Sequence, residues 1–94
     1  MANDLESMKQ DLGRRCRQAR EKRGLTRREV AHVLECDGST LSRFEAGKTV
    51  FSSRSDINAL IKLYELSSGD GEALLNLWRK IRHAKNEDVK KRRW

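Results

Sequence analysis

Two helix-start signals lie close together in the first half of the chain, so the helix that begins at the first signal must end before the second. Thr26 is followed three residues later by Glu29, the spacing of a capping box, in which the two side chains satisfy amide groups at the start of a helix. Asp37 is a favoured N-cap residue and precedes a second helical stretch. These signals predict helices near residues 27–34 and 38–46, joined by a tight turn.

Apolar residues recur at three- and four-residue steps before this pair, which predicts an amphipathic helix. Its apolar positions are Leu5, Met8, Leu12, Cys16 and Ala19. Gly24 follows, and a glycine just beyond the last turn is a common end for a helix. The first helix is therefore expected to stop before this glycine.

The second half of the chain shows helical spacing in two further segments. Ser53 is an N-cap residue type with Asp56 at the third helical position, and residues 67–70 predict a break before the last helix. The apolar faces of these helices contain Ile57, Leu60, Ile61 and Tyr64, and then Leu74, Leu77, Trp78 and Ile81. No segment alternates apolar and polar residues as a strand does. The predicted fold class is all-α, a compact five-helix domain.

The chain has 94 residues, of which 36% are apolar, and this suffices for one domain with a small core. We expect a domain over residues 1–84 and a basic C-terminal tail over residues 85–94. No stretch approaches the roughly 20 apolar residues of a membrane span, and no signal-peptide pattern is present. A cytoplasmic protein without a membrane partner is therefore expected.

The residue patterns predict neither catalysis nor a metal or cofactor site. Cys16 and Cys36 form no CxxC pair, and with His32 and His83 they lack the spacing of a zinc finger. No glycine-rich phosphate loop and no nucleophile–base pattern is present. The favoured interpretation of both cysteines is that they are small apolar core residues. We predict that the protein is not an enzyme and needs no cofactor or metal.

The formal net charge of +7 is unevenly distributed along the chain. Residues 9–28 carry nine bases and two acids, and residues 79–94 carry eight bases and two acids. The intervening residues 29–78 carry four bases and eight acids. A basic protein of this size favours a polyanionic partner, nucleic acid first and an anionic membrane surface second, although part of the charge can be a solvated face.

Two short helices joined by a turn of three or four residues form the helix-turn-helix pattern. Ala31 is small where the second helix crosses the first, and Cys36 supplies an apolar residue in the turn. Leu41 and Phe44 are predicted to face inward. The outward positions of the second helix are then Ser39, Thr40, Ser42 and Arg43, mostly short and polar, as suits a helix in the DNA major groove.

Two stretches of the sequence resemble those of a known family. They are Leu25-Thr26-Arg27-Arg28-Glu29-Val30-Ala31 and Ser39-Thr40-Leu41-Ser42-Arg43-Phe44-Glu45-Ala46-Gly47-Lys48. Over about residues 12–66 the chain resembles the XRE-type, lambda repressor-like DNA-binding domain. Residues 72–80 are similar to the fifth helix of the actinobacterial regulators of this class, which usually continue into a larger C-terminal domain.

The resemblance implies roles for particular residues. The positions at which members of the family reach base edges are Gly38, Ser39, Ser42 and Arg43. The positions expected at the DNA backbone are Arg27, Arg28, Thr40, Lys48, Thr49 and Arg54. Arg20 and Glu45 match an ion pair that ties the first helix to the recognition helix, and such a pair fixes geometry more than it adds stability.

Three positions depart from the family pattern. Glu35 occupies a turn position where glycine is common, and a left-handed conformation there costs a non-glycine residue about 1 kcal/mol. Gly38 either leaves a base contact empty or lets the helix N-terminus approach a phosphate closely. Phe51 stands where proline is frequent; core packing is the favoured interpretation, with DNA stacking or a dimer surface as alternatives.

These observations together predict sequence-specific binding of double-stranded DNA by a repressor-type transcriptional regulator on the nucleoid. A homodimer on an inverted repeat is expected, with half-sites roughly 34 Å apart. The alternative is a protein-interaction or antitoxin-like module on the same helical scaffold, because a fold does not fix its function.

Overall fold

The computed structural model describes the backbone of residues 4–92 and the side chains of residues 4–84. In this part of the chain all regular elements are helices: α1 (Asp4–Lys22), α2 (Arg27–Leu34), α3 (Gly38–Glu45), α4 (Arg54–Leu63) and α5 (Ser68–Arg92). The predicted all-α class with five helices is confirmed. None of these described helices has the length and apolar character that a membrane span requires.

The end of α1 and the start of α2 form as the local signals indicate. Gly24, two residues after the end of α1, takes φ 71°, and the N–H of Leu25 donates to the carbonyl of Arg20 at 3.2 Å. At the start of α2 the amide of Glu29 donates to the Thr26 hydroxyl at 3.1 Å, and the amide of Thr26 donates to the Glu29 carboxylate at 2.8 Å. The capping box is therefore complete.

Glu35 directly follows α2 and takes a left-handed conformation in the turn. Its φ is 56°, and the next amide, of Cys36, donates back to the carbonyl of Ala31 at 3.0 Å. The left-handed residue turns the chain so that Asp37 becomes the N-cap of α3, which begins at Gly38. The turn therefore forms with a glutamate, at the modest cost of about 1 kcal/mol expected for a non-glycine residue.

The start of α5 differs from the prediction of a break over residues 67–70. The hydroxyl of Ser67 accepts a hydrogen bond from the amide of Asp70 at 3.1 Å, so Ser67 is the cap and Ser68 begins the helix. The break lies just before it, where Glu65 takes φ 52°. The backbone of residues 85–92 continues α5, whereas the side chains of the predicted tail lie outside the described residues.

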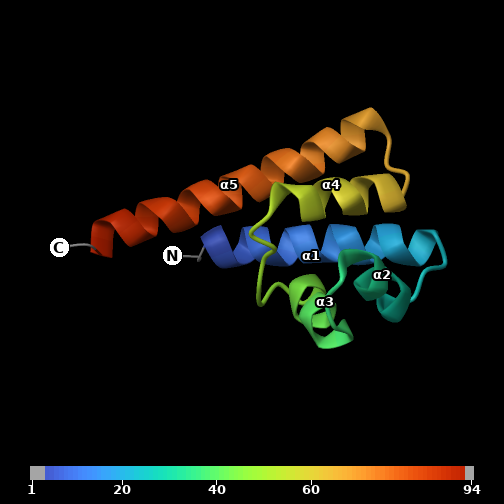
Figure 1. Cartoon of the computed structure of the whole chain (residues 1–94). Coiled ribbons are helices and arrows are strands. Elements are labelled where there is room, and N and C mark those ends of the chain that lie inside the picture. Colours follow the sequence, from blue (N-terminus) through green and yellow to red (C-terminus); the bar gives the residue numbers. More distant parts are fainter. Residues whose placement is uncertain (1–3, 93–94) are drawn as a thin grey trace.

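Helix α1 lies between two helix pairs, with α2 and α3 on one side and α4 and α5 on the other (Figure 1). The buried core contains Leu12, Cys16, Val30, Leu41, Phe44, Ile57, Leu60, Tyr64, Leu74, Leu75, Trp78 and Ile81. Phe51 packs on this core, with its ring centroid 4.6 Å from that of Phe44. The indole N–H of Trp78 donates to the carbonyl of Phe51 at 2.8 Å, which fixes the loop between α3 and α4 to α5.

Gly13 lets the middle of α1 approach the end of α3 closely. A Cβ atom at this position would lie 2.4 Å from the carbonyl oxygen of Phe44 and 2.5 Å from that of Glu45. Because both neighbours are backbone atoms, they cannot rotate away as a side chain does. No local pattern in the sequence marks Gly13, since the requirement for glycine comes from a helix distant in sequence.

We predict that Gly13→Ala destabilises the fold by about 1–3 kcal/mol, because overpacking against α3 outweighs the gain in helix propensity of about 1 kcal/mol. The matched control is Gly69→Ala in the first turn of α5, where an added Cβ meets no atom within 4 Å. Urea unfolding midpoints provide the measurement. A Gly13 variant as stable as the control would show that the two helices do not approach this closely.

Candidate nucleic-acid interface

One face of α3 packs on the core and the other is open to solvent. Leu41 and Phe44 are almost fully buried, and they hold the helix against α1 and α2. The predicted base-reading residues all lie on the exposed face: Gly38, Ser39, Ser42 and Arg43. Three of them have a short side chain or none, so Arg43 is the longest group on this face.

The residues predicted at the DNA backbone come from α2, α3, the loop after α3 and the start of α4. Arg27, Arg28, Lys48 and Arg54 are exposed, whereas Thr40 and Thr49 are partly buried. Within residues 4–84, no ion pair engages Arg28, Lys48 or Arg54. These three cations therefore have no internal partner among the described side chains to compete with a polyanion.

The N-terminus of α3 is organised by the carboxylate of Asp37. Its Oδ1 atom accepts from the Thr40 amide at 3.0 Å, the Thr40 hydroxyl at 2.8 Å and the Ser39 hydroxyl at 2.9 Å. Hydrogen bonds from Thr40, and then from Ser39, hold the pKa of this carboxyl below its ordinary value. Thr40, predicted at the DNA backbone, thus has its hydroxyl hydrogen directed at Asp37.

A buried ion pair joins α1 to α3. The guanidinium of Arg20 donates to both carboxylate oxygens of Glu45, with Nε to Oε2 at 2.8 Å and Nη2 to Oε1 at 3.2 Å. A third bond runs from Arg20 Nη1 to the carbonyl of Leu25 at 2.9 Å. The hydrogen bond to Glu45 raises the pKa of Arg20 above its ordinary value. This is the pair that the family resemblance implied.

Arg27 is also bonded to Glu45, which the sequence did not indicate. Its Nε donates to Oε1 of Glu45 at 3.2 Å, although nearly half of the Arg27 side chain remains exposed. The carboxylate of Glu45 therefore ties the recognition helix to both α1 and α2. The backbone-contact role predicted for Arg27 has to be compatible with this bond.

Much of the positive charge on α1 is paired within the protein. Asp11 pairs with Arg14 and Arg15, and Arg17 pairs with Glu21 at 3.2 Å. Arg23 instead reaches the C-terminal end of α4. Its Nε donates to the carbonyl of Tyr64 at 2.8 Å, a favourable position for a cation at the negative end of a helix.

A family model of the helix-turn-helix domain matches residues 11–75 of the 94 residues, a span that includes α2, α3 and α4. The chain belongs to the helix-turn-helix domain family. Searches among curated proteins and among solved structures found no match. The family match supports an XRE-like DNA-binding domain, and it indicates DNA binding and a regulatory role.

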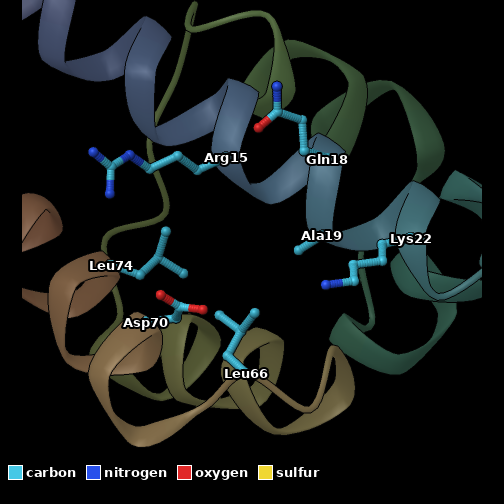
Figure 2. A pocket seen from close by; sticks show the side chains of 7 residues that line it. All are labelled: Arg15, Gln18, Ala19, Lys22, Leu66, Asp70 and Leu74. Atoms are coloured by element: carbon cyan, nitrogen blue, oxygen red, sulfur yellow. The ribbon is translucent and has the colours of Figure 1, made fainter.

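The helix-turn-helix domain also has a surface pocket of about 280 Å³, which lies between α1 and the start of α5 (Figure 2). Its lining residues are Arg15, Gln18, Ala19, Lys22, Leu66, Asp70 and Leu74. Lys22 and Asp70 point toward it from opposite walls (Figure 2). Residues predicted to contact DNA do not line this pocket, so it lies outside the candidate interface. Among the described residues, no group of three or more His, Cys, Asp or Glu side chains is placed to hold a metal ion.

We predict that Glu45→Gln destabilises the helix-turn-helix domain by about 3 kcal/mol, the low end of the range for breaking a buried ion pair, because Arg20 keeps its bond to Leu25. Glu21→Gln, which removes an exposed pair with Arg17, is the matched control and should change stability by less than about 1 kcal/mol. Urea unfolding of both variants measures the difference. Equal stability of the two variants would contradict the role assigned to Glu45.

The two thiols of the domain should differ in reactivity. Burial, with a smaller effect of Glu45, raises the pKa of Cys16 to about 12, whereas Cys36 is only partly buried. At pH 8 the thiol of Cys36 is expected to react with a disulfide reagent in the folded protein. The thiol of Cys16 is expected to react only as the protein unfolds. Cys36→Ser should abolish the fast phase. Two equally fast phases in the wild type would contradict the burial of Cys16.

Proposed function

We propose that this domain binds a specific sequence of double-stranded DNA, with α3 in the major groove, and acts as a repressor-type transcriptional regulator on the nucleoid. The observation that carries the proposal is the arrangement of α3. Its inner face is fixed by a buried core and by Glu45, while its outer face presents short polar side chains and one arginine. A helix of this kind fits a groove about 12 Å wide.

Base recognition is assigned to the exposed face of α3. Arg43 is the best candidate for a bidentate contact with guanine, the commonest specific contact in protein–DNA complexes. Ser39 and Ser42 have short side chains, so they reach base edges only when the helix lies deep in the groove. Gly38 adds no side chain, and a Cβ there would meet no other atom, so the start of α3 is open to a close approach.

Phosphate contacts are assigned to the cations that flank this face. Arg28 at the start of α2, Lys48 after α3 and Arg54 at the start of α4 are exposed and unpaired among the described side chains. Thr49 lies beside Lys48 in the same loop. Arg27 adds charge at the start of α2 while its Nε is bonded to Glu45. These contacts would set the orientation of α3 and the dependence of affinity on salt.

The proposed complex is a symmetric dimer on an inverted repeat. Two recognition helices related by a twofold axis read half-sites one helical turn apart, roughly 34 Å, on the same side of the DNA. A dimer doubles both the base contacts and the phosphate contacts of a domain that has one short recognition helix. Selection from random duplexes therefore should enrich a palindrome.

The test is the affinity of variants for the selected duplex and for random duplex DNA. Arg43→Ala should lose about 1–3 kcal/mol on the selected duplex, with relaxed preference at one base pair, and little on random DNA. Lys48→Ala should weaken binding to both and reduce the salt slope by about 1. Arg79→Ala, an exposed residue of α5 that bonds to Asn76, is the matched control.

Equal losses on selected and random DNA for Arg43→Ala would contradict base recognition by this residue. No binding to any duplex at moderate salt would contradict the proposed function as a whole, and would favour a protein-interaction module.

A further inference from the structure

The hydrogen bonds of Asp37 define which way the hydroxyl groups at the start of α3 point. Oδ1 of this carboxylate lies 2.9 Å from the Ser39 hydroxyl oxygen and 2.8 Å from that of Thr40. An ionised carboxylate can only accept hydrogen bonds. Each hydroxyl group has one hydrogen, so both hydrogens are directed at Asp37.

Asp37 is ionised at neutral pH in this arrangement. It is an exposed N-cap, and the hydrogen bonds it accepts hold its pKa below the ordinary value. A negative charge at the N-terminus of a helix is also favoured by the helix dipole. The negative charge of Asp37 is therefore sufficient to make the Ser39 and Thr40 hydroxyl groups the donors in these two hydrogen bonds.

Thr40 has a second partner on its other side. Its hydroxyl oxygen accepts a long bond of 3.5 Å from Nη2 of Arg43, one turn further along α3. The chain of contacts runs from Asp37 through Thr40 to Arg43, the proposed guanine-reading residue. The contact with Arg43 is long and therefore weak. The Thr40 hydroxyl hydrogen is directed at Asp37, so it is not available to a phosphate oxygen, which can only accept.

Ser39 differs because its oxygen has no second partner among the described side chains, and the residue is exposed. Its hydrogen is committed to Asp37, so only lone pairs face outward. In the major groove, hydrogen-bond donors are the exocyclic amino groups, N6 of adenine and N4 of cytosine. The other polar atoms of the groove and backbone are acceptors: purine N7, guanine O6, thymine O4 and the phosphate oxygens. An acceptor cannot form a hydrogen bond with the Ser39 oxygen, because its hydrogen is already donated to Asp37.

We infer that Asp37 is a positioning residue for specificity: it makes Ser39 an acceptor, so that Ser39 selects an exocyclic amino group on the facing base. The inference rests on the proposed function and extends it to the chemical group that is recognised. It also removes the Thr40 hydroxyl as a donor to the DNA backbone, because that hydrogen is directed at Asp37.

The experiment combines protein variants with base analogues in the duplex selected by the wild-type protein. Ser39→Ala identifies the position whose preference is lost. At that position, purine in place of adenine, or pyrimidin-2-one in place of cytosine, removes the amino group. A 7-deaza purine in the same base pair removes the N7 acceptor instead.

Removal of the amino group should weaken wild-type binding about three- to tenfold more than it weakens binding by Ser39→Ala, as expected for the loss of one hydrogen bond. The 7-deaza duplex should weaken both proteins equally. A larger effect of the 7-deaza substitution on the wild type, or equal effects of both analogues on both proteins, would overturn the inference while leaving DNA binding intact.

Asp37→Asn separates the positioning role from helix capping. Asparagine caps a helix about as well as aspartate, so the thermal unfolding temperature should change little. Its side-chain amide can donate to Ser39 and release the hydroxyl hydrogen. The effect of removing the amino group should then differ by less than about twofold between Asp37→Asn and the double variant that adds Ser39→Ala.

An undiminished difference between these two folded proteins would overturn the role of Asp37. Failure of the wild-type protein to select any sequence would instead overturn the proposed function itself.

Discussion

The carboxylate of Glu45 is the group on which the geometry of the recognition helix depends. It lies at the buried end of α3 and receives Arg20 from α1 and Arg27 from α2, at 2.8 and 3.2 Å. At Gly13 the α1 backbone also approaches the end of α3 closely. Buried ion pairs contribute little net stability, but one that is shared by three helices defines a single relative orientation. The exposed face of α3 is presented at a fixed angle as a result.

The structure also divides the positive charge of the protein into two classes. Arginines of α1 pair with Asp11 and Glu21, and Arg23, directly after α1, reaches the C-terminal end of α4. These cations therefore support the helices. The cations near α3 without partners among the described side chains are fewer: Arg28, Lys48 and Arg54. A net charge of +7 therefore says little about where DNA binds until the internal pairs are known. The proposed interface would use these cations, which come from three separate segments of the chain.

What could be predicted from the sequence was decided by distance along the chain. The caps at Thr26 and Asp37 depend on residues three positions away, and both form as predicted. The cap at Ser67 is equally local, but residues 67–70 are all small or polar and were therefore predicted as a break. The close approach at Gly13 and the bond between Arg27 and Glu45 depend on residues distant in sequence. The pair of Arg20 and Glu45, 25 residues apart, was accessible only through family resemblance.

In the proposed complex, DNA lies against α3 and not against the more basic surface of α1. Backbone amide chemical shifts, measured as a selected duplex is added to the full chain, test it most directly. The largest changes are expected over residues 38–43 and at Lys48, with small changes at Arg14 and Arg17. The largest changes at Arg14 and Arg17, with α3 unaffected, would contradict it.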